Sequence, residues 1–125
     1  LLALINPIPG RDMPPAGAQG AIGLAQTMDN EELRTFLAPI HDKKTELQLM
    51  VERTFLSELD GSCRTPICGL AQIEKDKIIF KGEILKPDGS KIFKDTWSGN
   101  VSEAAHIGKM AGLTLKEKGG DGFFK

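Results

Sequence analysis

Three stretches of alternating apolar and polar residues follow one another in the second half of the chain. They cover residues 67–74, 77–86 and 91–98, and alternation of this length is typical of half-buried β-strands. Residues 75–76 and 87–89 between them predict hairpin turns, the second one because proline and glycine preset the backbone angles of a tight turn. The pattern therefore predicts an antiparallel meander. The apolar face of its middle strand consists of Ile78, Phe80, Gly82 and Ile84.

Apolar residues at helical spacing precede and follow this meander. One helix is predicted to begin near Asp42 and to stop at Gly61, because glycine commonly ends a helix. The last helix is predicted to follow a cap at Asn100 or Ser102 and to end at residues 119–120. The expected buried stripes are Leu47, Met50, Val51, Phe55 and Leu59 in the first helix and Ala104, Ile107, Ala111 and Leu115 in the last.

A shorter helix is expected ahead of these two. Asp29 and Glu32 have the spacing of a capping box, and Pro39 is expected to end or kink the helix because proline removes a backbone donor. Helices on both sides of a meander can cover its apolar face. The sequence therefore predicts an α+β fold over residues 28–120, in which a three-stranded antiparallel sheet is covered on one face by helices.

The first part of the chain has a different character. Residues 1–14 contain several prolines and no sustained period, which indicates an irregular connector. Residues 16–26 are rich in small side chains, and the apolar run at 21–24 suits a buried strand that another backbone approaches closely. We accordingly divide the chain into residues 1–27, a connector with a strand, and residues 28–125, the α+β domain.

Charge and composition exclude several functions. The chain has 16 Lys and Arg against 17 Asp and Glu, and a formal charge of −1 argues against a dedicated surface for nucleic acid or anionic membrane. Its apolar runs are far shorter than the roughly 20 residues of a membrane span. Two cysteines are too few for a disulfide framework, so a reducing, cytoplasmic location is expected.

One of these cysteines, Cys63, lies in a well-defined local context. Residues 52–60 are predicted to form the last turns of a helix, Gly61 its end, and Pro66 the opening of a strand, which places the thiol on a short loop. Residue type alone would favour a half-buried structural cysteine. The chain combines this loop with an upstream segment, P-A-G-A-Q-G-A at residues 15–21.

The two segments together resemble the porphobilinogen deaminase (hydroxymethylbilane synthase) family. That family carries P-A-x-G-Q-G-A and, a few dozen residues later, E-R-x-F-L-x-x-L-x-G-G-C-x-x-P, and residues 15–21 and 52–66 match both segments in the same order. The chain departs from these segments at Ser62, which replaces the second glycine before the cysteine, and at Ala18, which replaces the glycine of P-A-x-G. Thr27 also stands where many members of the family have arginine. The resemblance covers nearly the whole chain. It implies the C-terminal portion of a larger enzyme, with residues 1–27 belonging to the preceding domain.

The resemblance also implies a transferase of tetrapyrrole and heme biosynthesis, which polymerises four porphobilinogen molecules into hydroxymethylbilane and releases ammonia. Cys63 would hold the dipyrromethane cofactor through a thioether, with Gly61 and Ser62 beside it. Gln19 and Gly20 match the Q-G pair that lines the cofactor cleft in the family. There an amide can bond a pyrrole substituent while glycine lets the chain come close.

According to the same resemblance, no catalytic residue lies in this chain, because the family's catalytic aspartate and carboxylate-binding arginines precede it. The isolated chain is expected to be an inactive monomer without cofactor, and the missing N-terminal domains are its expected partners. Glu52 and Arg53 are interpreted as a structural ion pair or surface element rather than a catalytic dyad.

Several other interpretations were weighed against this one. Cys68 is expected to be packed in the first strand, and no metal site is expected because His41 and His106 lack ligand spacing. The order helix, three strands, helix also fits a double-stranded-RNA-binding module, but the start of the last helix lacks the basic cluster that such a module needs. A third alternative is an interaction domain in which Cys63 is never modified.

Overall fold

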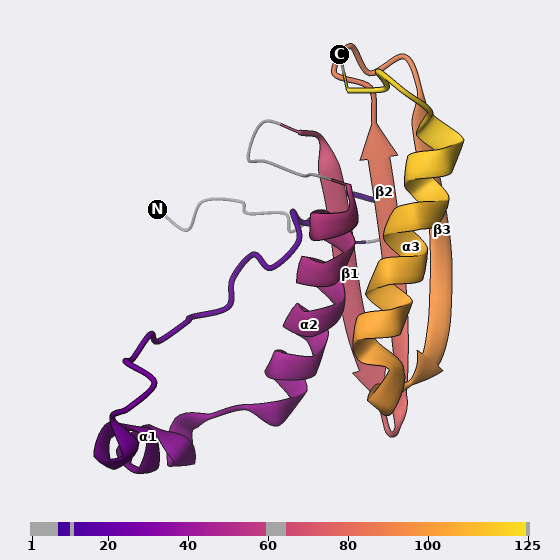
Figure 1. Cartoon of the computed structure of the whole chain (residues 1–125). Coiled ribbons are helices and arrows are strands. Elements are labelled where there is room, and N and C mark those ends of the chain that lie inside the picture. The colour runs from indigo at the N-terminus through magenta and orange to yellow at the C-terminus, as the bar shows by residue number, and fades with distance from the viewer. Residues whose placement is uncertain (1–7, 11, 60–64, 125) are drawn as a thin grey trace, which may run out of the picture.

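The described part of the chain forms a two-layer structure. The computed structural model describes residues 8–10, 12–59 and 65–124. Figure 1 shows one sheet with two long helices on the same side of it, and a small helical segment that stands away from this body. These layers confirm the predicted α+β fold. The elements are α1 (Glu31–Leu37), α2 (Lys43–Glu58), β1 (Ile67–Glu74), β2 (Lys77–Leu85), β3 (Ile92–Asn100) and α3 (Ala104–Gly119).

The sheet is the predicted antiparallel meander, with strand order β1, β2, β3. Its register places Gly69 opposite Gly82. A Cβ atom at Gly69 would lie 3.0 Å from the Phe80 ring, and one at Gly82 would lie 3.0 Å from the Phe55 ring. The paired glycines therefore leave room for two aromatic rings, whose centroids are 5.0 Å apart in an edge-to-face arrangement.

Helices α2 and α3 pack against each other and cover one face of the sheet (Figure 1), α2 over β1 and α3 over β3 and β2. Two glycines of α3 permit this close approach. A Cβ atom at Gly108 would collide with the backbone carbonyl oxygen of Val51, and one at Gly112 would lie 2.5 Å from the Cβ atom of Glu58. The helices can therefore pack at this separation only because α3 has no side chain at these positions.

The core lies between the helices and the sheet. It confirms most of the predicted stripes, because Val51, Phe55 and Leu59 of α2 are buried, whereas Met50 is 40% exposed. The tail after α3 also contributes to the core, which the sequence had not indicated. Phe123 is 6% exposed, and its ring centroid lies 5.5 Å from that of Phe93. The remaining buried apolar residues are Ile67, Ala71, Ile78, Phe80, Ile84, Ala104, Ile107, Ala111 and Leu115.

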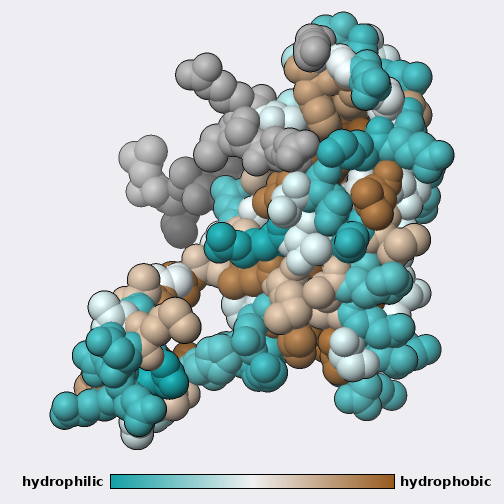
Figure 2. Space-filling view, in the orientation of Figure 1, coloured by the Kyte–Doolittle hydropathy of each residue, from teal (hydrophilic) through white to brown (hydrophobic). Residues whose placement is uncertain are grey.

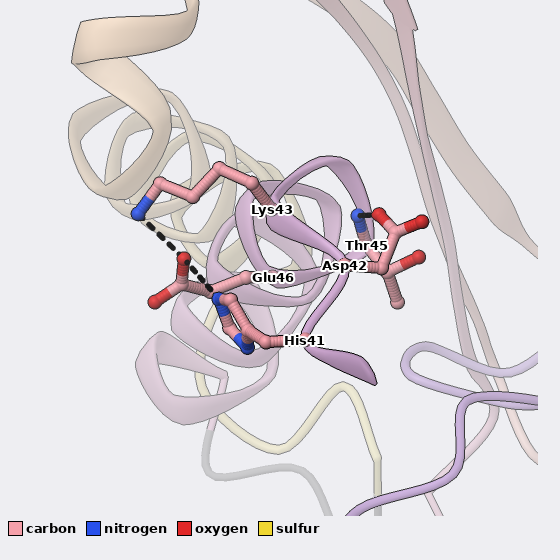
Figure 3. Close-up of polar contacts among 5 residues, drawn as sticks. All are labelled: His41, Asp42, Lys43, Thr45 and Glu46. Atoms are coloured by element: carbon pink, nitrogen blue, oxygen red, sulfur yellow. Dashed lines mark hydrogen bonds and ion pairs between the residues drawn. The ribbon is translucent and has the colours of Figure 1, made fainter. Parts of the chain in front are cut away.

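The start of α2 confirms the predicted boundary at Asp42 (Figure 3). The Asp42 Oδ1 atom accepts a hydrogen bond from the Thr45 backbone N–H at 2.7 Å, which satisfies one of the free donors of the first turn. Glu46 accepts a hydrogen bond from Lys43 Nζ at 2.6 Å and lies 3.3 Å from His41 Nε2. The hydrogen bond from Thr45 holds the pKa of Asp42 below its usual value, and those from Lys43 and then His41 do the same for the pKa of Glu46.

The short helix differs in part from the prediction. Asn30, not Asp29, caps α1, because the Asn30 side chain accepts a hydrogen bond from the Leu33 backbone N–H at 2.9 Å. The α-helix ends before Pro39, as expected, and continues as a 3-10 helix at Ala38–Ile40. Its apolar side chains are not buried: Phe36 is 78% exposed. Figure 2 shows the lobe around α1 apart from the main body, with hydrophilic and hydrophobic side chains mixed on its surface.

The predicted buried strand at residues 21–24 is wrong for this structure. Residues 21–27 have no strand pairing, and Ile22 is 94% exposed. A buried strand needs a layer of protein on each face, whereas most of residues 21–27 are exposed and none of them pairs with a strand. The pairing lies earlier instead, where Ala16 forms an isolated antiparallel bridge with Cys68. Within the described residues, no helix is both long and apolar enough to cross a lipid bilayer.

Candidate functional site

The predicted site has one part outside the described residues and one part within them. Gly61, Ser62 and Cys63 fall in the stretch 60–64, which lies outside the described part of the chain. The structure does describe the element at each end of this stretch, α2 before it and β1 after it. The assignment of Cys63 as an anchor therefore stays a prediction.

Gln19 and Gly20 lie in a turn close to the outer edge of β1. The Gln19 backbone N–H donates to the Ala16 carbonyl oxygen at 3.3 Å, and Ala18 and Gly20 have left-handed φ angles of 62° and 86°. Gln19 is exposed, and among the described residues other than Gly20 and its two chain neighbours, no heavy atom lies within 4 Å of the place where a Cβ atom of Gly20 would stand. The turn can therefore present a side-chain amide and an uncovered stretch of backbone to a ligand.

The residues just before this turn are attached to the domain. The Gly69 backbone N–H in β1 donates to the Pro15 carbonyl oxygen at 3.2 Å, next to the bridge between Ala16 and Cys68. A Cβ atom at Gly17 would lie 3.0 Å from the Leu56 side chain, so the segment also packs closely on α2. Residues 15–17 thus contact both elements that flank the stretch 60–64.

A buried glutamate completes this attachment. Glu52 of α2 is only 7% exposed. Its Oε1 atom accepts a hydrogen bond from the Ala71 backbone N–H of β1 at 2.8 Å, and its Oε2 atom accepts one from the Ala18 backbone N–H at 2.6 Å. Of the two interpretations offered for Glu52, a structural ion pair or a surface element, the second is therefore wrong. The Glu52 carboxylate joins the helix, the strand and the turn that carries Gln19.

A second side chain of α2 covers the same point of the strand. Gln48 Nε2 donates to the Ala71 carbonyl oxygen at 2.7 Å. The outward-facing N–H and C=O groups of Ala71 are thus both satisfied by side chains from the helix. Because free donors and acceptors on an edge strand would otherwise have to be hydrated or paired with another chain, these two bonds close part of the edge of β1.

The helical spacing of the sequence already indicated that Glu52 lies on the buried face of α2, whereas its charge favoured an exposed position. Glu52 precedes Phe55 by three positions and Leu59 by seven, which is the spacing of the buried stripe. A glutamate at such a position must find hydrogen-bond donors when it is buried. The donors here are backbone N–H groups on two other segments, which the sequence pattern of α2 alone does not reveal.

Cys68 is held in a structural position. Its side chain is half-buried, and Ala16 pairs with it at the edge of the sheet. Burial, and next the nearby Glu83 carboxylate, raise the pKa of the Cys68 thiol, which keeps it in the neutral form. This agrees with the expectation of a packed cysteine. Within the described residues, no group of three or more His, Cys, Asp or Glu side chains could hold a metal ion.

Comparison with known proteins identifies related sequences. The family model for the porphobilinogen deaminase C-terminal domain matches residues 46–117, which include most of α2, the whole sheet and most of α3. Two curated relatives are each 42% identical to the chain over 110 residues. They are the porphobilinogen deaminases of Nitrobacter hamburgensis and Nitrobacter winogradskyi.

The alignments with these relatives cover most of this chain but only a minor part of each relative. Each includes 88% of this chain but only 35% of the relative, so the chain spans about a third of the length of the curated proteins that it matches. The family model, in contrast, matches more than half of the chain and lies over the two-layer domain. The chain therefore belongs to the porphobilinogen deaminase family, as a member of its C-terminal domain group.

Proposed function

We propose that this chain is the cofactor-anchoring C-terminal part of a porphobilinogen deaminase. The complete enzyme would polymerise four porphobilinogen molecules into hydroxymethylbilane and release ammonia. Support comes from the family match and from the presence, in the same order, of the segments at residues 15–21 and 52–66. The relatives' names provide the substrate, porphobilinogen.

In this proposal Cys63 holds the dipyrromethane through its sulfur atom, and Gly61 and Ser62 precede it directly in the sequence. When bound, that group supplies a covalently held pyrrole end for chain growth. The described part of the site fits such a group, since Gln19 is exposed and no described residue beyond the chain neighbours of Gly20 fills the space within 4 Å of a Cβ atom at that position. Gln19 would bond a polar substituent of the pyrrole through its amide.

The main structural support for the proposal is the attachment of the turn with Gln19 and Gly20. The turn with Gln19 and Gly20 is fastened, through Pro15 and Glu52, to the two elements on either side of the stretch 60–64. Two segments that are distant in the sequence, each matching a family motif, are thus attached to one structural unit. This arrangement supports a single site that is built from both segments.

The proposal can be tested with a chimera in which this chain replaces the matching part of the Nitrobacter hamburgensis relative. We expect the chimera to release ammonia from porphobilinogen, whereas the isolated 125-residue chain releases none. A Cys63→Ser chimera should lose this activity, and a Cys68→Ser chimera should retain most of it. A folded chimera without activity, or an active Cys63→Ser chimera, would contradict the proposal.

The structure does not favour RNA binding. At the start of the last helix, the Glu103 carboxylate accepts a hydrogen bond from the Asn100 backbone N–H at 3.0 Å. A double-stranded-RNA-binding module would place cations there to contact phosphates. We therefore expect no retention of double-stranded RNA by the chain at either low or high salt.

A further inference from the structure

Among the described residues, Glu52 is the charged residue that is buried in the core. We infer that Glu52 is a positioning residue, which fixes the turn carrying Gln19 and Gly20 against α2 and β1. The link of this role to a cofactor rests on the proposed function. The role itself rests on the two hydrogen bonds and on the burial of the carboxylate.

The bond to Ala18 holds a backbone conformation that the residue does not favour. Ala18 has a φ angle of 62°, a left-handed conformation that an alanine adopts with a steric penalty. Such a conformation persists when surrounding contacts determine it. The 2.6 Å bond from the Ala18 N–H to a carboxylate oxygen is one such contact, and Gln19 comes directly after it.

The side chain at position 52 faces two backbone N–H groups, those of Ala18 and Ala71, so it needs two acceptor atoms and no donor. The glutamate carboxylate meets this need, because each of its oxygens accepts one N–H. A glutamine of nearly the same shape has one oxygen and one NH₂ group, so one of the two backbone N–H groups would face another donor. An aspartate has the right chemistry but is shorter by one methylene group, so it cannot reach both partners from the same helix.

The same carboxylate bonds to β1 while it is itself part of α2. It therefore sets the position of the turn relative to both elements that bracket the stretch 60–64. Loss of this bond should loosen the turn and leave the apolar core in place, since Val51 and Phe55 are unchanged. In the complete enzyme, Gln19 would then be less well placed for a cofactor that is attached to Cys63.

The first test measures amide hydrogen exchange by NMR in the 125-residue chain. In the unsubstituted chain, the Ala18 amide should exchange at least about tenfold more slowly than in an unstructured peptide, because it is hydrogen-bonded. In Glu52→Gln this protection should fall by about tenfold or more, which corresponds to the loss of one charge-assisted hydrogen bond. An unprotected Ala18 in the unsubstituted chain would overturn the inference without any variant.

Gln48→Met provides the matched control. It removes a neighbouring hydrogen bond from the same helix, which goes to the Ala71 carbonyl oxygen rather than to residues 15–20. We expect Gln48→Met to leave Ala18 protected, although the melting temperature can fall as much as in Glu52→Gln. Equal protection of Ala18 in Glu52→Gln and Gln48→Met would overturn the inference.

The second test uses the chimeric enzyme and separates the inference from the proposed function. Intact mass gives the fraction of protein that carries cofactor, and kinetics give KM for porphobilinogen. Glu52→Gln should reduce the loaded fraction or raise KM several-fold, and Gln48→Met should do neither. Absence of cofactor from the unsubstituted chimera would refute the proposed function. Equal loading and KM in all three proteins would refute the role of Glu52 in the cofactor site.

Discussion

At the scale of single residues, two glycines in α3 determine how closely the helix layer packs. We predict that Gly112→Ala lowers the free energy of unfolding by about 1–3 kcal/mol, as overpacking of a close contact typically does. The added methyl group would lie 2.5 Å from the Glu58 Cβ atom and 3.1 Å from the Phe55 carbonyl oxygen. Urea unfolding followed by circular dichroism would measure the change.

Gly23→Ala is the control for this substitution. No heavy atom lies within 4 Å of the added methyl group, so its stability should equal that of the original chain to within about 0.5 kcal/mol. If Gly112→Ala proved as stable as Gly23→Ala, the close approach of α2 and α3 would be incorrect.

Another prediction at this scale concerns the tail. Phe123→Ala should cost about 3 kcal/mol of unfolding free energy, because it removes a buried ring that contacts Phe93. Phe36→Ala removes the same atoms from a side chain that is 78% exposed, and it should cost less than about 0.5 kcal/mol. Thermal melts of both variants would compare them, and equal melting temperatures would show that the tail does not belong to the core.

Sequence reasoning succeeded for residues whose role depends on local pattern. The stripe residues Val51 and Phe55 are buried as predicted because helical spacing alone places them on one face. It failed for Glu52 and Phe123, whose burial depends on partners from other segments. The positions of Gln19 and Gly20 in a turn could not be predicted either, since a bond from another element holds that turn.

At the scale of elements, the sheet was predictable because each strand and turn carries its own signal. β1 has the predicted bounds, and β3 ends two residues later than expected, at Asn100. The less regular elements were not predicted as well. The cap of α1 is Asn30 rather than Asp29, because both residue types are good caps and neighbouring positions compete. The apolar run at 21–24 has strand character, but strands also need a neighbouring strand.

The start of α2 should respond to pH. The pKa of Asp42 and of Glu46 is lower in the folded chain than in the unfolded one, so both carboxylates contribute stability above their unfolded pKa. This contribution is lost as pH falls through the lowered folded values. The melting temperature should therefore decrease between about pH 5 and pH 2.

Asp42→Asn isolates the contribution of the cap. Asparagine also caps helices well but does not titrate, so this variant should lose less melting temperature on acidification than the original chain. Melting curves followed by circular dichroism at several pH values would compare the two proteins. Identical pH profiles would show that Asp42 does not contribute to the acid sensitivity.

Across the whole molecule, buried apolar residues lie from α2 onward, whereas most of the large apolar residues that the structure describes before α2 are exposed. The core comes from α2, the sheet, α3 and the tail, whereas Ile22, Phe36 and Ile40 are exposed by 94%, 78% and 68%. Residues 15–18 connect these two parts through β1 and Glu52. The organisation of the proposed site thus depends on contacts between distant segments, and the family resemblance, not local pattern, led to Gln19 and Cys63.

Mass spectrometry of the chimeric enzyme, first intact and then after digestion to peptides, tests whether Cys63 anchors the cofactor. We expect a mass increase equal to two linked porphobilinogen-derived pyrrole units, located on the peptide that contains Cys63. The increase should persist in Cys68→Ser and disappear in Cys63→Ser. An active enzyme with an unmodified Cys63, or with the added mass on Cys68, would show that Cys63 is not the anchor.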